Sequence, residues 1–199
     1  MSYKSLSYIN HLIGIVILVA ISMYADHDCI EEFKNGQIIT INNPFPQKWL
    51  LVGNKSLADT TLHEELRLTH HKHYSVTKGA FNAGNFCALK DSVYISVSIN
   101  DFGTSVDFSN VPPKCFECKP IEEDIGYLFS GTGLKIGQNK KDVEAKLGFS
   151  IKQNITSFEF EEIENNGKSK VLHTQTLRVE FHLNKLMRFT ILDYRESYE

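Results

Sequence analysis

The clearest pattern in the chain is an alternation of apolar and polar residues over positions 177–191. In the first run, the apolar side holds Leu177, Val179, Phe181 and Leu183, and the polar side holds Arg178, Glu180 and His182. After a turn at Asn184-Lys185, Met187, Phe189 and Ile191 alternate with Arg188 and Thr190. A period of two residues predicts an antiparallel hairpin with one face in the core.

A short helix is predicted just before the strands, over 139–147. Asn139 is a suitable N-cap, and Asp142 follows it at the capping-box position. Val143 and Leu147 would share one face of the helix, and Gly148 stands where a left-handed helix end favours glycine. With further strands expected near 157–163, 170–183 and 186–193, residues 133–193 predict a helix packed on a β-meander.

The rest of the chain also predicts short strands and few helices. Strands are expected at 37–41, 49–52, 93–99, 104–108 and 127–129, and a helix at 59–68, with a strand from Leu66 onward as the alternative. We therefore expect an α+β fold, predominantly antiparallel β-sheet, with short helices packed on one face. A division into two similar halves is one form of this expected fold. The expected parts are a signal peptide (1–25), an N-terminal half (26–112), a loop (113–120) and a C-terminal half (121–199).

The beginning of the chain indicates export. Lys4 is the only charged residue before Asp26, and residues 12–23 (LIGIVILVAISM) carry no charge. A basic start, an apolar run and small residues after it are typical of a secretory signal peptide, with cleavage preferred after Ala25 and an alternative after Ser22. The competing interpretation is an uncleaved anchor, but the run is shorter than the ~20 residues that span a bilayer. We expect a periplasmic or secreted bacterial protein with no stable membrane span after cleavage.

The charge balance excludes some classes of partner. Removal of residues 1–25 takes away one lysine and changes the net charge from −3 to −4. A mildly acidic chain without a basic stripe argues against binding to nucleic acid or to anionic membranes. No motif for a cofactor is present, and we expect none.

Four cysteines remain in an exported chain, and their even number predicts disulfides with three possible connectivities. Cys115 and Cys118 form the obvious local pair, which leaves Cys29 with Cys87. A redox-active Cys-x-x-Cys needs its first thiol at a helix N-terminus. Because Pro112 and Pro113 precede this motif and Pro120 follows it, we expect a structural bridge.

The most metal-like cluster is His70, His71 and His73, with His63 upstream. In a strand, His71 and His73 would point the same way, and a secreted metal-dependent hydrolase is the alternative function. Lys72 within the cluster would repel a cation, so a solvated histidine-rich loop is preferred. The acidic run Glu159, Glu161, Glu162 and Glu164 is best interpreted as an edge strand protected by charge.

One stretch resembles a known type of module. The pattern Gly133-Leu-Lys-Ile-Gly137-x4-Asp142-Val143-x3-Leu147-Gly148 resembles the helix signature of the SmpA/OmlA (BamE-like) lipoproteins and of the β-lactamase-inhibitor-like fold. In those modules a β-meander follows the helix, as Phe181 to Phe189 would here. The resemblance covers about a third of the chain and implies protein binding or envelope assembly, not catalysis.

We therefore expect a non-catalytic protein that binds another protein. It would be either an inhibitor or immunity protein, or an envelope accessory factor. The acidic net charge favours the inhibitor or immunity protein. The predicted contact residues are Phe116, on the proline-flanked loop, and Arg178, Glu180, His182 and Arg188, on the polar side of the hairpin. The alternative for Phe116 is that it packs between the two halves.

Overall fold

A computed structural model describes residues 36–198, apart from 53–54, 60, 77–83, 101, 114–117, 123–130 and 167–168. The predicted signal peptide, Cys29, Cys115, Phe116 and the strand expected at 127–129 lie outside the described residues. Among the described residues, no helix has the length and apolar character needed to cross a membrane.

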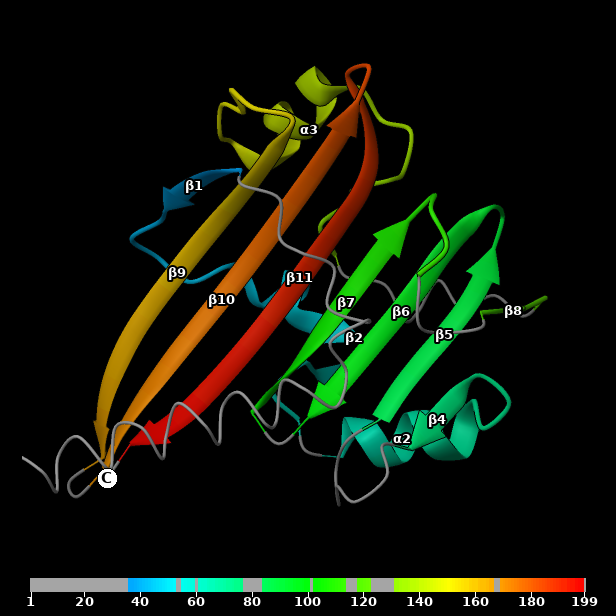
Figure 1. Ribbon diagram of the computed structural model, residues 1–199. Helices are drawn as coiled ribbons and strands as arrows, with labels where there is room; N and C mark the ends of the chain where they lie inside the picture. The colour runs from blue at the N-terminus through cyan, green and yellow to red at the C-terminus, as the bar shows by residue number, and fades with distance from the viewer. Residues whose placement is uncertain are drawn as a thin grey trace, which may run out of the picture. The chain divides into compact units, whose positions relative to one another are not determined.

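One mixed sheet runs through the described part of the chain in the order β1-β9-β10-β11-β7-β6-β5-β4, with β8 beside β5 (Figure 1). The strands are β1 (Gln37–Thr40), β4 (Tyr74–Val76), β5 (Gly84–Lys90), β6 (Val93–Asn100), β7 (Gly103–Ser109), β8 (Lys119–Pro120), β9 (Ile155–Asn166), β10 (Ser169–His182) and β11 (Lys185–Tyr198). β1 pairs with β9 and β8 with β5 in parallel, and the other pairings of this sheet are antiparallel. A separate small hairpin joins β2 (Leu51–Val52) and β3 (Lys55–Ser56).

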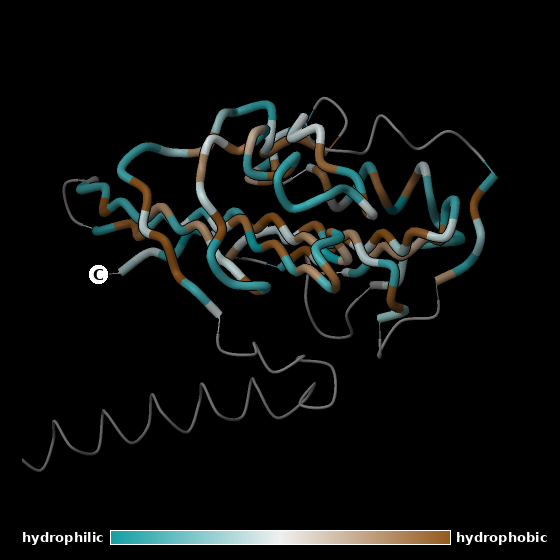
Figure 2. The backbone as a smooth tube through the Cα atoms, turned by 90° about the horizontal axis from the view of Figure 1, so that it is seen from above, coloured by the Kyte–Doolittle hydropathy of each residue, from teal (hydrophilic) through white to brown (hydrophobic). Residues whose placement is uncertain are grey.

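The hydrophobic core lies on one face of the sheet, which we call the core face. The 3-10 helix η1 (Gln47–Leu50) and the helices α2 (Leu62–Thr69) and α3 (Lys140–Leu147) cover it, as Figure 2 shows from above. Each element buries apolar side chains against the strands, among them Trp49, Leu66 and Val143 above Phe86, Phe108 and Phe181. Strand alternation then leaves a second, polar face, formed by the residues between those of the core face.

The helix and the hairpin lie where the sequence predicts them. α3 buries Val143 and Leu147, and Gly148 ends it in the left-handed conformation with φ of 74°. The turn, however, is formed by Leu183 and Asn184, both with positive φ. Leu183 is therefore not on the apolar side of a strand but 81% exposed in the turn. A bulge at Glu180/Phe181 also changes the register, so Leu186 enters the core instead of Met187.

Two further expectations need correction in the N-terminal half. Trp49 and Leu50 belong to η1, with strand β2 beginning only at Leu51. The strand β5 was not predicted, because its residues Phe86, Cys87 and Ala88 are all buried and the run has no alternation. Fully buried strands give this weak signal.

At the coarse level, the α+β prediction is confirmed: strands dominate the described residues, and the helices are few and short. β11 pairs with β7 from Arg188↔Ser109 to Tyr194↔Gly103. The sheet therefore runs without a break through the stretches assigned to the two halves.

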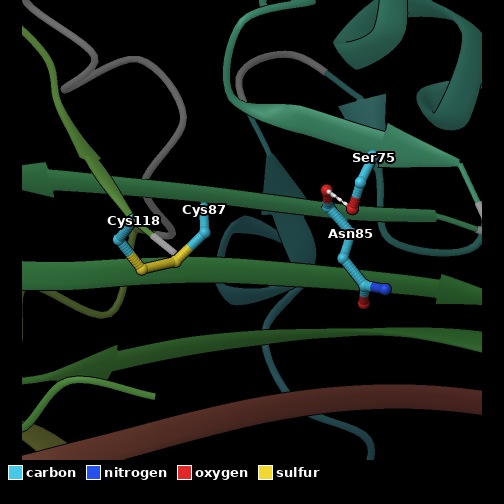
Figure 3. The surroundings of a disulfide bond; sticks show 4 residues. All are labelled: Ser75, Asn85, Cys87 and Cys118. Atoms are coloured by element: carbon cyan, nitrogen blue, oxygen red, sulfur yellow. Dashed lines mark hydrogen bonds between the residues drawn. A yellow bond between two sulfur atoms is a disulfide. The ribbon is translucent and has the colours of Figure 1, made fainter. Parts of the chain in front are cut away.

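The disulfide pairing differs from the predicted one. Cys87 on β5 is bonded to Cys118, just before β8, with the two Cα atoms 4.8 Å apart (Figure 3). The local Cys115–Cys118 pair and the Cys29–Cys87 pair are both wrong. The parallel pairing of β8 with β5 holds Cys118 beside Cys87, and sequence proximity carries no information about this contact. Among the described residues no cysteine is free.

Candidate functional site

The polar face of the sheet gathers charged groups from two distant stretches of the chain. In register, Arg178 lies opposite Thr190, Glu180 opposite Arg188, and Thr190 opposite Asp107. Paired residues point to the same face, so β10, β11 and β7 bring these groups into one cluster. Three of the predicted contact residues, Arg178, Glu180 and Arg188, therefore lie together, with α3 on the opposite face of the sheet.

Asp107 is the centre of this cluster. Its Oδ1 accepts hydrogen bonds from Nε of Arg188 at 2.7 Å and from Oγ1 of Thr190 at 2.6 Å. On the neighbouring strand, Nε of Arg178 donates to Oε1 of Glu180 at 2.9 Å. Charge-assisted bonds of this kind fix the direction of each side chain.

Burial changes the acidity of the cluster. It raises the pKa of Asp107 to about 6; the hydrogen bond from Thr190 opposes this rise, and the Glu180 carboxylate adds to it. Burial also lowers the pKa of Arg188. Desolvation disfavours the charged form of each group, which explains the opposite directions for an acid and a base.

The exposure of the predicted contact residues is uneven. Arg178 is only 9% exposed, and the side chains of Glu180 and Arg188 are 19% and 27% exposed. His182 is exposed at the end of the hairpin, opposite Lys185. The cluster thus fixes charged groups in the polar face. Because these side chains are largely buried, a large contact area for a partner has to come from other residues.

The exposed area lies at the far end of the same face, where β9, β10 and β11 extend past the end of β7. We call this the distal patch, defined as Phe102, Glu161, Ile163, Leu172, Tyr194, Glu196 and Tyr198. Phe102 is 52%, Ile163 63% and Tyr198 45% exposed. Large apolar side chains gathered in one exposed place are typical of a binding surface.

A second polar cluster lies on the core face. Nε2 of His173 is 2.7 Å from Oδ1 of Asp193, and the amide nitrogen of Gln175 is 3.3 Å from the same Nε2. Oε1 of Gln175 accepts the N–H of Phe45 at 2.9 Å. With a proton on Nε2, His173 donates a hydrogen bond to the carboxylate of Asp193. The cluster ties the loop of Phe45 to the sheet.

Among the described residues, the buried His–Asp pair has no nucleophile beside it. Nε2 of His173 donates to Asp193, and its other near neighbour is the amide nitrogen of Gln175, not a serine or cysteine hydroxyl or thiol. Nucleophilic catalysis needs such a group within hydrogen-bond reach of the base. We interpret the pair as part of the packing of the core.

The histidines at 70–73 occupy a turn between α2 and β4, not a strand. His70 is buried edge-on against Phe86, with ring centroids 5.6 Å apart, and His73 is tilted against the same ring at 6.1 Å. His71 is exposed. The structure therefore places two of them around an aromatic ring of the core, and no group of three metal-ligating side chains is found among the described residues.

Two concavities lie on the core-face side. A cavity of about 220 Å³ lies between the 57–59 segment and the turn at 100–103, with Asp193 and Arg195 in its wall. A groove of about 430 Å³ follows β1 beside Phe45, Trp49 and Phe149, and its lining side chains are uncharged. The groove offers packing surface without acid–base groups.

The acidic run lies on an edge for three of its four glutamates, whereas Glu159 pairs with Thr40 of β1. β1 pairs only with Thr156 to Glu159 of β9, so Glu161, Glu162 and Glu164 lie beyond that pairing, where β10 is the only strand beside β9 among the described residues. Charged side chains protect such an edge from pairing with other chains.

Sequence reasoning missed Asp107 and the distal patch. Asp107 alternates with Val106 and Phe108, which is a polar-out signal, but its partners on β11 lie far along the chain. Tyr194, Glu196 and Tyr198 continue the alternation of the hairpin past the predicted end of its second strand at 193. No protein-family model, curated protein or solved structure matches this chain.

Proposed function

We propose that this is an exported, non-catalytic protein that binds another protein through the polar face of its sheet. The observation that supports the proposal is the distal patch, because Phe102, Ile163 and Tyr198 are large, exposed and at the same end of the polar face. The Asp107 cluster adds a fixed arrangement of charge farther along the same face. Interfaces combine exposed aromatic anchors with a polar surround in this way.

Two versions of this function differ in the partner. An inhibitor or immunity protein would cover the active site of a toxin or hydrolase, and an envelope accessory factor would hold a component of an assembly. The net charge of −3 favours the inhibitor, since an acidic surface speeds association with a basic cleft. The resemblance of residues 133–193 to SmpA/OmlA-like and inhibitor-like modules is compatible with both.

The test uses a photo-crosslinking amino acid placed at position 163 in the producing cell. We expect a crosslinked species of discrete mass from position 163 and none from position 141, on the exposed side of α3. A second variant, Ile163→Ser, should then abolish co-purification of that species without lowering the melting temperature, because Ile163 is exposed. Equal crosslinking from both positions, or no loss with Ile163→Ser, would show that the polar face is not the binding surface.

A further inference from the structure

The end of the polar face carries an ordered group of two tyrosines around one carboxylate. Tyr194, Glu196 and Tyr198 alternate along β11 and so share the polar face. The Tyr198 hydroxyl donates to Oε2 of Glu196 at 2.6 Å, and the Tyr194 hydroxyl donates to the same oxygen at 3.3 Å. Phe102 packs against Tyr194 with ring centroids 6.0 Å apart. The rings and the carboxylate are therefore held in place before any partner arrives.

The hydrogen bonds leave half of the carboxylate available. Oε2 of Glu196 accepts both hydroxyls, while Oε1 has no hydrogen-bond partner within the part of the chain that the structure describes. Burial and Glu196 raise the pKa of Tyr194, and the hydrogen bond to Glu196 raises that of Tyr198. Both tyrosines thus remain neutral donors to Glu196.

The charge around this group is negative. On the polar face near the patch, the described residues supply the carboxylates of Glu159, Glu161 and Glu196 and one lysine, Lys170. Lys170 lies opposite Tyr198 and makes no salt bridge among the described residues. A complementary partner therefore carries positive charge at this point.

The apolar neighbours of Glu196 indicate what kind of side chain a partner would place here. In register, Ile163 lies opposite Leu172, and Leu172 lies opposite Glu196. A long side chain with an apolar stem and a cationic head matches this order, because its stem covers the aliphatic pair while its head reaches the carboxylate. Aromatic rings beside the head add a cation–π attraction.

We infer that the distal patch receives a lysine or arginine side chain of a basic partner protein, with Glu196 as its counter-ion and Tyr194 and Tyr198 beside it. The inference rests on the proposed function and names the chemistry of the partner. The other possible occupant of an exposed apolar face is a second copy of this chain, and the test must distinguish the two.

The test uses a short, end-capped peptide with two arginines and two leucines, and the same peptide with citrulline in place of each arginine. NMR of the full-length mature protein would follow the ring signals of Tyr194 and Tyr198. We expect the arginine peptide to shift these signals saturably and to bind about tenfold more tightly than the citrulline peptide, because citrulline keeps the shape and removes the charge.

Matched variants separate a site from a general attraction between charges. Glu196→Gln should weaken binding of the arginine peptide about tenfold, and Tyr198→Ser should weaken it more than Tyr198→Phe. Glu162→Gln removes the same charge from the same three strands but on the opposite face, and should leave the affinity unchanged. Equal losses for Glu196→Gln and Glu162→Gln would overturn the inference.

Two further results would also overturn it. One is equal binding of the two peptides. The other is a concentration-dependent dimer in sedimentation that Ile163→Ser dissociates, since a second copy would then cover the patch. If the peptides fail while the crosslinked partner at position 163 is still lost with Ile163→Ser, the partner binds here without a basic group, and the proposed function stands alone.

Discussion

Arg188 on β11 donates from Nε to Oδ1 of Asp107 on β7 at 2.7 Å, although 81 positions of the chain separate them. The pair is the charged link across the junction between strands of the N-terminal and C-terminal stretches. It also stands at the centre of the polar face. Several properties of the protein can therefore be tested at these two residues.

Arg188→Ala should lower the free energy of unfolding by about 2 kcal/mol at pH 7.5, because it leaves a half-buried carboxylate without its partner. The control is Arg67→Ala, which breaks the exposed i,i+3 pair with Glu64 and should have an effect of under about 1 kcal/mol. Urea unfolding followed by circular dichroism measures both. Equal effects would mean that Arg188 is not held as described.

The Asp107 carboxyl should titrate near pH 6 in NMR, well above its ordinary range, because it is buried. Thr190→Val should raise this pKa further, since the hydroxyl stabilises the charged form. A raised pKa in the folded state means that the folded protein holds this proton more tightly than the unfolded chain. The contribution of Asp107 to stability is therefore greatest below about pH 4 and falls as the pH rises towards 6. Asp107→Asn should remove this dependence.

Val143→Asp should destabilise the protein by more than about 3 kcal/mol, because it places a charge where α3 meets the core. Lys141→Ala, on the exposed side of the same helix, should change the stability by less than about 0.5 kcal/mol. Thermal melts of the two variants give the comparison. Similar shifts in melting temperature would contradict the packing of α3.

The mature protein should contain no reactive thiol after purification from an oxidising compartment. Cys87→Ala and Cys118→Ala should each lower stability by about 3 kcal/mol, since either one opens a bridge between residues 31 positions apart. The variant with both changes should lose about as much stability as either single variant, because both changes open the same bridge. A further loss would come only from the packing of the second side chain. Thiol titration under denaturation and mass mapping of the bridged peptides are the measurements; a Cys115–Cys118 peptide would contradict the pairing.

Purified native protein should not carry stoichiometric zinc or iron. His70 and His73 pack against Phe86, and His71 is exposed without two further ligands among the described residues. Elemental analysis of the native protein measures this directly. Stoichiometric metal that is lost with His71→Ala would instead support the metal-dependent hydrolase.

Local elements were the predictable part of the fold. α3 and the hairpin depend on contacts within a few residues, so Asn139, Val143, Gly148 and the alternation after Leu177 are enough to indicate them. The turn was predicted one residue too late in the chain. Leu183 is apolar and continues the alternation of the strand, but it adopts a positive φ and belongs to the turn. The bulge at Glu180/Phe181 then places Leu186, instead of Met187, in the core.

Contacts across the chain were not predictable. Nothing near Cys87 indicates that β8 will lie beside it, and nothing near Asp107 indicates Arg188. Arg178, Glu180 and Arg188 share one face because they belong to one hairpin, but their burial depends on the whole sheet, and their role in binding stays a prediction. Phe116 lies outside the described residues, and its role stays a prediction.

The place of β11 in the sheet has a consequence for the order of folding. It follows the other described strands along the chain, yet it lies between β10 and β7 in the interior of the sheet. Until it emerges, β7 has no partner on that side, and Phe45 cannot meet Gln175, 130 residues further on. Such distant contacts slow folding. The sheet therefore closes only after β11 has been made, and until then the chain is incompletely folded, which is the state that the export proposed above would require.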